Sequence, residues 1–292
     1  MSSAVSIDPG GSSAAMLPLP AQARAVARSR WWVELLTIGW LLFLYDAVTN
    51  LAPLRLSTAL GNARGILHVE RVLHVDPELS LDRWLTSHHS LGLILSDYYD
   101  NAHFVVTLGV LAWLWWRRAE LYRPLRNSLV LVNVIGFIVF WRFPVAPPRM
   151  LDGFTDVVAS THAFGSWHTG ALASAANQLA AMPSLHMAWA AWCTLALWQA
   201  SRRAVVRALA VAYPCLTGLA VLATGNHFLL DIVGGLAALA LAVLLVGWLS
   251  GVTGHHAPAW PARWRVRRRH AEPGRPALRM SQTCYEVQDT VE

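Results

Sequence analysis

A histidine and an aspartate stand four residues apart in the cluster Gly225-Asn226-His227-Phe228-Leu229-Leu230-Asp231. Residues four apart share one face of a helix, so the Asp231 carboxylate can accept a hydrogen bond from one nitrogen of the His227 ring. Such a bond fixes the tautomer and leaves the other ring nitrogen as a nucleophile. An alternative interpretation is that His227 and Asp231 form a structural pair that caps the helix, and the spacing alone leaves both interpretations open.

A second histidine follows a proline and a serine in Met182-Pro183-Ser184-Leu185-His186. Proline is favoured in a first helical turn, where free N–H groups and the helix dipole attract an anion. The Ser184 hydroxyl adds a donor, and His186 would face the bound anion. Taken alone, a histidine at a helix start is more often structural.

Two arginines flank a proline-rich stretch, Arg142-Phe143-Pro144-Val145-Ala146-Pro147-Pro148-Arg149. The prolines favour a stiff, extended connection, which holds both guanidinium groups at small entropic cost. Guanidinium groups bind phosphate oxygens through paired N–H donors. By itself the pair also fits an interfacial anchor.

The three clusters together supply phosphate clamps, a nucleophile with its orienting carboxylate, and a second histidine as general acid. These are the parts that phosphoryl transfer through a covalent phosphohistidine needs.

The composition shows what must position these residues. The chain has 292 residues, of which 55% are apolar and only 14% charged, whereas soluble domains carry roughly 25% charged residues. This shortfall excludes a soluble nucleic-acid-binding protein, despite the net charge of +6, and predicts a multi-pass membrane protein that contacts lipids.

Six stretches approach the roughly 20 apolar residues that a membrane-spanning helix needs. They predict an all-α, polytopic bundle of six transmembrane helices at residues 31–49, 98–116, 127–141, 184–199, 204–224 and 228–249. The second stretch is the weakest, because its first residues are polar and better suited to the wall of a site.

Arginine placement predicts the orientation, because cytoplasmic loops retain positive charge near the membrane. Arginines gather in residues 24–30, 117–126, 202–207 and 263–269. We therefore expect a disordered cytoplasmic arm (1–30), a membrane domain in the cell membrane (31–250), and a cytoplasmic tail that is basic and then polar (251–292). The three clusters then lie at the extracytoplasmic face, together with two outer segments. Residues 51–97 are expected to hold interfacial helices, one of them near 80–87, and residues 142–183 form the second segment.

The sequence resembles the type 2 phosphatidic acid phosphatase superfamily, whose pattern is Lys-x6-Arg-Pro, then Pro-Ser-Gly-His, then Ser-Arg-x5-His-x3-Asp. The resemblance by motif covers about 127–249, and the first two predicted spans match only in general form. It implies that His227 is the nucleophile, Asp231 its orienting partner, and His186 the acid that protonates the leaving oxygen. Arg142, Arg149 and Ser184 are implied as phosphate-binding residues. No metal and no cofactor are implied, and the implied substrate is a lipid phosphate or phospholipid.

The sequence departs from the family pattern at several positions. Arg142 replaces a lysine, Met150 a proline and Leu185 a glycine. Ala220 and Val221 occupy the Ser-Arg positions, so one phosphate-binding arginine is missing. These features are similar to the branch that contains inositol phosphorylceramide synthases, which transfer a phosphorylated head group to a lipid alcohol.

Two functions remain open at this point. The first is a membrane enzyme, either a lipid phosphate phosphatase or an inositol-phosphotransferase-like enzyme, according to whether water or an alcohol accepts the phosphoryl group. The second is an inactive lipid-binding or transport protein on the same fold.

Weaker signals concern other residues near the predicted site. Tyr99, Asn101 and His103 are candidates for a head-group pocket. Arg55, Arg64 and Arg71 are candidates to replace the missing arginine. The sequence does not specify the acceptor, the oligomeric state or whether residues 51–97 act as a lid.

Overall fold

The computed structural model describes residues 30–37, 39, 40, 43, 55–161 and 179–252. The predicted arm before Arg30 and the tail beyond residue 252 lie outside these residues. So do most of the second half of the first predicted span and residues 162–178 of the second outer segment.

The described residues form helices joined by short connections, with no β-strand among them. Residues 31–37 are helical. The helices that follow are α2 (Leu56–Val72), α3 (Glu78–Thr86), α4 (His89–Arg117), α5 (Ala119–Arg142), the 3₁₀ turn η1 (Pro148–Met150), α6 (Val157–Thr161), α7 (Leu185–Ala200), α8 (Ala204–Ala223) and α9 (Leu229–Val252). The predicted all-α class is therefore confirmed, and α3 lies where an interfacial helix was expected.

Three helices are long and apolar enough to cross a membrane: Ala119–Arg142, Ala204–Ala223 and Leu229–Gly251. They coincide with the third, fifth and sixth predicted spans. Helix α7 has 16 residues, fewer than the roughly 20 that a bilayer core requires. Helix α4 is 29 residues long but does not meet the same hydropathy criterion within the described chain. Crossing by α4, α7 and the first span stays a prediction.

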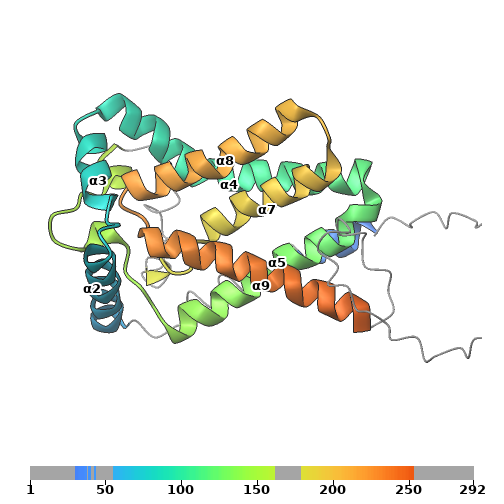
Figure 1. The fold of residues 1–292 in the computed structure, drawn as a ribbon, viewed down its shortest axis with the longest axis horizontal. Helices are drawn as coiled ribbons and strands as arrows, with labels where there is room; N and C mark the ends of the chain where they lie inside the picture. The colour runs from blue at the N-terminus through green and yellow to red at the C-terminus, as the bar shows by residue number, and fades with distance from the viewer. Residues whose placement is uncertain (1–29, 38, 41–42, 44–54, 162–178, 253–292) are drawn as a thin grey trace, which may run out of the picture. The chain divides into compact units, whose positions relative to one another are not determined.

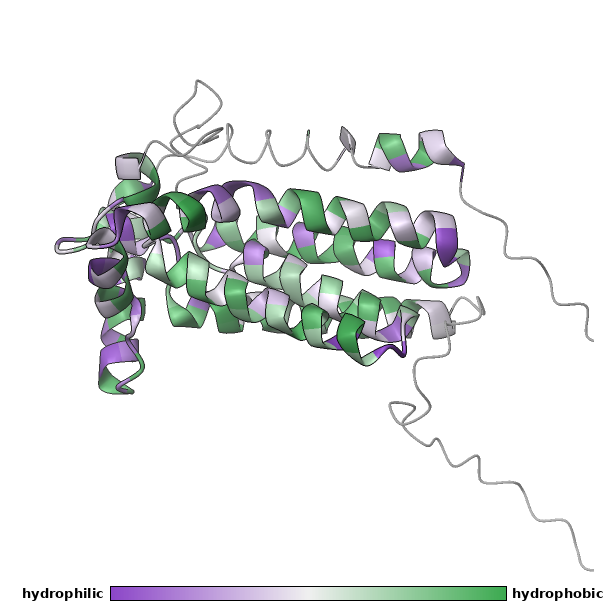
Figure 2. Cartoon of the chain, turned by 90° about the horizontal axis from the view of Figure 1, so that it is seen from above, coloured by the Kyte–Doolittle hydropathy of each residue, from purple (hydrophilic) through white to green (hydrophobic). Residues whose placement is uncertain are grey.

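Large apolar side chains remain exposed along the outer faces of these helices. Examples are Val105 on α4, Leu209 on α8, and Leu244 and Trp248 on α9. Figure 2 shows long apolar stretches along the bundle and a mixture of polar and apolar residues on α2. A helix that is apolar on its exposed face as well as its buried one is typical of a membrane environment.

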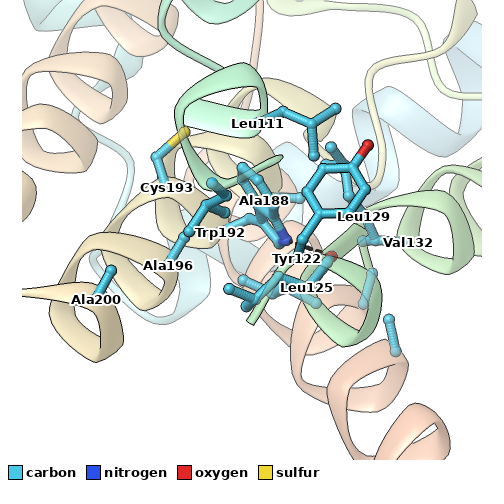
Figure 3. Close-up of a cluster of buried hydrophobic side chains, with 14 residues drawn as sticks. Leu111, Tyr122, Leu125, Leu129, Val132, Ala188, Trp192, Cys193, Ala196 and Ala200 are labelled. Atoms are coloured by element: carbon cyan, nitrogen blue, oxygen red, sulfur yellow. Dashed lines mark hydrogen bonds between the residues drawn. The ribbon is translucent and has the colours of Figure 1, made fainter. Parts of the chain in front are cut away.

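The core of the bundle lies between α4, α5, α7 and α9 and includes a fully buried tryptophan, Trp192 of α7. Its indole nitrogen donates a hydrogen bond to the carbonyl oxygen of Leu125 at 2.9 Å (Figure 3). Tyr122, Leu125 and Leu129 of α5 surround it. A buried indole N–H needs such a partner, so Trp192 fixes the register of α7 against α5.

Helix α5 starts earlier than the sequence suggested. Residues 117–126 were predicted as a loop because they contain four arginines, but only Arg118 interrupts the helices there. Tyr122, Leu125 and Leu129 are buried on one face, and this apolar face continues the helical period through the charged stretch. Residues 201–203 separate α7 from α8, and α8 begins at Ala204, where the fifth predicted span also begins.

The arginine-rich ends of the helices meet at one end of the bundle. Arg118, after α4, donates a hydrogen bond to the carbonyl oxygen of Ala200, the last residue of α7, at 3.0 Å. Helices α2 and α3 lie at the other end, where α7 and α9 begin (Figure 1). The predicted site residues His186, His227 and Asp231 therefore lie at the end away from the arginines.

Helices α7 and α9 approach closely where α7 begins, and the contact depends on Gly235. A Cβ atom at this position would overlap the carbonyl oxygen of Ser184. Backbone cannot yield as a flexible side chain can, so the two helices would have to separate.

Gly235→Ala is therefore expected to lower the free energy of unfolding by about 1–3 kcal/mol, as overpacking of a tight contact does. Gly251→Ala on the same helix is the control, because no atom lies within 4 Å of its added methyl group. Thermal unfolding of both variants in detergent measures the difference. Equal stability of the two variants would show that the close approach is not required.

Candidate active site

The proline-rich connection between α5 and η1 is buried and fixed by backbone hydrogen bonds. Val145 N–H donates to Leu179 O at 2.9 Å, and Ala181 N–H donates to Val145 O at 3.1 Å. On its other side, the Asn62 side chain of α2 donates to Pro144 O at 2.8 Å. These bonds hold residues 179–181, which lie just before α7, against the proline-rich connection. Ala181 thereby becomes part of the site.

His227 lies in the turn between α8 and α9, one residue before Phe228 and outside the helix. The N–H groups of Asn226 and His227 both donate to Val221 O at 3.1 Å. Gly225 has a φ of +67°, a conformation that glycine adopts at little cost. The prediction that His227 and Asp231 share a helical face was wrong in its geometry, because α9 begins only at Leu229.

The contact between His227 and Asp231 arises instead from a helix cap. Asp231 Oδ2 accepts the N–H of Phe228 at 2.9 Å and lies 3.4 Å from His227 Nδ1. His227 Nδ1 also lies 2.9 Å from Ala181 O. A carbonyl oxygen only accepts, so Nδ1 carries the proton and Nε2 keeps the lone pair that a nucleophile needs.

His186, the second residue of α7, lies directly against this lone pair. Its Nδ1 atom is 3.4 Å from His227 Nε2. The His186 ring stacks on Tyr99 with centroids 4.5 Å apart, and the ring of His103 meets it edge-on at 4.3 Å. Two aromatic neighbours from α4 therefore hold the orientation of His186. The two imidazoles come from stretches 41 residues apart in the sequence and face each other.

Ser184 is the N-cap of α7, and its buried hydroxyl oxygen accepts the N–H of Met187 at 3.3 Å. Its own N–H donates to Asp231 O at 2.9 Å, which ties the start of α7 to the first turn of α9. Pro183 precedes the helix, so the expectation that it occupies the first helical turn was wrong. The Ser184 hydroxyl proton remains a donor.

Arg149 is held beside the His227 turn. Its backbone N–H donates to Gly225 O at 2.8 Å, its Nη1 donates to the Asn226 side-chain oxygen, and its Nε pairs with Asp156 at 3.2 Å. Asn226 in turn donates to Thr224 Oγ1 at 2.8 Å. The sequence placed Asn226 in the cluster but gave it no role.

Arg142 ends α5 and is exposed. Among the described residues it forms no hydrogen bond or ion pair with the other predicted phosphate-binding residues. The structure therefore brings together His227, His186, Asp231, Ser184 and Arg149, whereas Arg142 is exposed at the end of α5 and is not joined to them by a hydrogen bond or ion pair in the described part of the chain.

A small cavity of about 10 Å³ lies beside His186 between α4, α7 and α8, enough for about one water molecule. Its lining consists of Tyr98, Tyr99, His103, His186, Thr217, Ala220 and Val221. Two of the three residues predicted for a head-group pocket are in this lining. Asn101 is not in this lining, and its amide donates to Asp97 on the same helix.

Val221, at the position of the missing arginine, is fully buried among apolar neighbours. None of the three arginines proposed to replace it lines the cavity beside His186. Arg64 and Arg71 are exposed on α2, Arg55 is exposed just before it, and Arg71 lies 3.8 Å from Asp76.

Three buried acids around the His227 turn were not singled out from the sequence: Glu70, Glu78 and Asp82. Glu70 and Glu78 accept the N–H groups of Leu230 and Leu229, each at 2.7 Å. Burial raises the pKa of Glu70 to about 8 and also raises the pKa of Glu78 above its usual range. In the sequence these acids belong to a segment that mixes arginines with acids, and only their placement in the fold distinguishes them.

No group of three His, Cys, Asp or Glu side chains is placed to hold a metal ion in the part of the chain that the structure describes.

The fold and these contacts define an all-helical protein with apolar, membrane-length helices and a paired-histidine site at one end of the bundle. The sequence profile of the PAP2 superfamily matches residues 64–245, well over half of the chain, and this range includes both histidines, Asp231 and the predicted phosphate-binding residues. The chain therefore belongs to the PAP2 superfamily, which generally comprises phosphatases. No curated protein and no solved structure shows significant similarity to it.

Proposed function

We propose that this protein is a membrane-embedded enzyme that takes the phosphoryl group, or a phosphorylated head group, from a lipid phosphate ester through a phosphohistidine on His227. Membership of the PAP2 superfamily suggests a phosphatase or a phosphotransferase. The observation that carries the proposal is the 3.4 Å contact between His227 Nε2 and His186 Nδ1, together with the Nδ1 proton that Ala181 O fixes.

In the first step the Nε2 lone pair of His227 attacks phosphorus, and the bond from phosphorus to the leaving oxygen breaks. Protonated His186 gives its proton to that oxygen, which departs as an alcohol. In the second step an acceptor O–H gives its proton to His186 while its oxygen attacks phosphorus. The P–N bond then breaks and His227 is regenerated.

Arg149, Arg142 and the Ser184 hydroxyl are proposed to bind the phosphate oxygens. Arg149 is the best placed of the three, because it is held beside His227 by Asn226 and Asp156. Its guanidinium can move from these partners to a phosphate with little change of backbone. Asp231 is proposed to hold the His227 ring and to stabilise the positive charge that forms on it.

The site is proposed to face the extracytoplasmic side of the cell membrane, with both termini in the cytoplasm. The clustering of arginine-rich helix ends at the opposite end of the bundle supports this orientation. Exposed apolar residues along the bundle support a lipid substrate, because lipid head groups would reach the helix ends at the level of His227.

The acceptor defines two versions of the function. Water makes the protein a lipid phosphate phosphatase. An alcohol makes it an inositol-phosphotransferase-like enzyme, which the buried Val221 in place of arginine and the Pro-Ser-Leu-His motif support by similarity to that branch. The catalytically inactive lipid-binding protein remains the alternative, although lipid binding alone would not require two facing histidines.

Purified protein in detergent, given phosphatidic acid or phosphatidylinositol with a chelator present, is expected to release phosphate or diacylglycerol. The reason is that the proposed nucleophile, general acid and phosphate-binding groups are all side chains of this protein, so no step requires a metal ion. Chromatography and mass spectrometry of the products, with and without an added lipid alcohol, distinguish hydrolysis from transfer. Activity that disappears with the chelator and returns with a divalent metal would contradict the proposed mechanism.

A further inference from the structure

We propose that Glu70 of α2 and Glu78 of α3 are positioning residues of the active site, which hold the turn from His227 to Asp231 by accepting backbone N–H groups at the start of α9. The inference rests on the proposed function for its effect on turnover. Its effect on the turn itself does not depend on that function.

The start of α9 is capped by three carboxyl groups. A helix start leaves backbone N–H groups without partners inside the helix. Here the N–H of Phe228 goes to Asp231, that of Leu229 to Glu78 and that of Leu230 to Glu70, at 2.9, 2.7 and 2.7 Å. Two of the three caps come from helices about 150–160 positions earlier in the sequence. Capping by distant residues therefore joins α2 and α3 directly to the start of α9.

The capped N–H groups lie between the two residues of the proposed catalytic pair. Phe228, Leu229 and Leu230 separate His227 from Asp231, and Asp231 Oδ2 lies 3.4 Å from His227 Nδ1. A shift of this turn by a few tenths of an ångström would therefore change the contact between the Asp231 carboxylate and the His227 ring. On the opposite side the turn is held by Ala181 O and by the Ser184 N–H.

The acids are retained in surroundings that penalise them. Both side chains are fully buried, and one oxygen of each, Glu70 Oε2 and Glu78 Oε2, has no hydrogen-bond partner in the described part of the chain. Burial raises the pKa of Glu70 to about 8, so its carboxyl group is mostly protonated at pH 7. A neutral cap satisfies the N–H group and adds no negative charge near a phosphate.

The same segment contacts the other side of the catalytic turn. Asp82 of α3 accepts the N–H of Thr155 at 3.0 Å, and its second oxygen lies so close to Gly225 that an added Cβ would approach it to 3.2 Å. Helices α2 and α3 are thus fixed to the turn at several points. In this proposal α2 and α3, which belong to the segment whose role as a lid the sequence leaves open, support the site from one side.

The reach of the side chain and its ability to ionise can be separated by two substitutions at each position. Gln keeps the length and the accepting oxygen but cannot ionise, whereas Asp keeps the ionisable carboxyl group but is one methylene shorter. Positioning by reach predicts that Glu70→Gln and Glu78→Gln stay within about 3-fold of wild type. Glu70→Asp and Glu78→Asp should lose about 10–100-fold in kcat with KM nearly unchanged, because small misplacements of reacting groups have effects of this size. Asp76→Asn, in the connection between α2 and α3, is the control and should behave as wild type.

Hydrogen exchange of residues 224–232, followed by mass spectrometry, gives a readout that needs no turnover. The Leu229 and Leu230 amides should exchange at least about 10-fold faster in the Asp variants than in the Gln variants and wild type, as loss of a local hydrogen bond predicts. Exchange that is unchanged in the Asp variants, or faster in Gln than in Asp, would overturn the proposal whatever the activity. Absence of His227-dependent turnover in wild type would instead overturn the proposed function, and the exchange order would still decide this inference.

Discussion

The His227→Ala protein is expected to lose at least about 10³-fold in turnover, because the first step has no other nucleophile in the proposed mechanism. His227 Nε2 is the only one of its two ring nitrogens with a free lone pair, since Nδ1 donates to Ala181 O. Release of phosphate or diacylglycerol from phospholipid micelles measures the effect.

A matched control separates this effect from general loss of structure. His89 is exposed at the start of α4, so His89→Ala should retain wild-type turnover. Thermal unfolding of the His227→Ala protein should remain cooperative, because two neighbouring N–H groups of its turn still reach Glu70 and Glu78. Wild-type rates in a folded His227→Ala protein would remove His227 from the chemistry.

His186→Ala is expected to reduce turnover of natural lipid esters by about 10²–10⁴-fold, the usual contribution of a general acid. The loss should depend on the leaving group. An alkoxide needs a proton as it departs, whereas a nitrophenolate departs without one. With a nitrophenyl phosphate ester the same variant should therefore lose about 10-fold or less, since the missing proton transfer no longer limits the step.

The comparison of the two substrates is the decisive part of this experiment. A role for His186 in binding or packing alone would reduce turnover of both esters equally. Tyr99→Phe provides a control for packing, because it keeps the ring that stacks on His186 and should change the ratio between the two substrates little. An equal loss on both esters in His186→Ala would assign His186 a structural role.

The sequence predicted which residues gather at one end of the bundle better than it predicted their local geometry. His227, His186, Asp231, Ser184 and Arg149 were each singled out from residue type and spacing, and the structure brings them together at one end of the bundle. The four-residue spacing of His227 and Asp231 nevertheless misled about the local structure. The same spacing allows a helical face or a cap that folds back on the preceding turn, and only the start of α9 at Leu229 distinguishes them.

The supporting residues could not be found from local patterns. Glu70 and Glu78 stand in a segment of mixed charge, where an acid normally faces water. Their burial depends on contacts with residues about 150–160 positions away. Ala181 supplies only a backbone oxygen to His227, and a backbone group leaves no signature in residue type.

The predicted helix boundaries were wrong where the charge pattern and the apolar periodicity of the sequence pointed to different structures. The arginines of residues 117–126 indicated a loop, but Tyr122 and Leu125 continue the buried face of α5. Arginine side chains at a helix end can extend toward water while their helix continues. The six predicted spans follow from apolar stretches alone, and three of them are long and apolar enough as helices in the structure.

The most direct test of the central claim is to trap the covalent intermediate. Wild-type protein mixed with a phospholipid substrate, quenched rapidly under alkaline conditions and digested, should carry a phosphoryl or phospho-head-group adduct on His227 by mass spectrometry. Asp231→Asn should carry less of it, and His227→Ala none. Steady turnover with an unmodified His227, or with the adduct on another residue, would contradict the proposed mechanism.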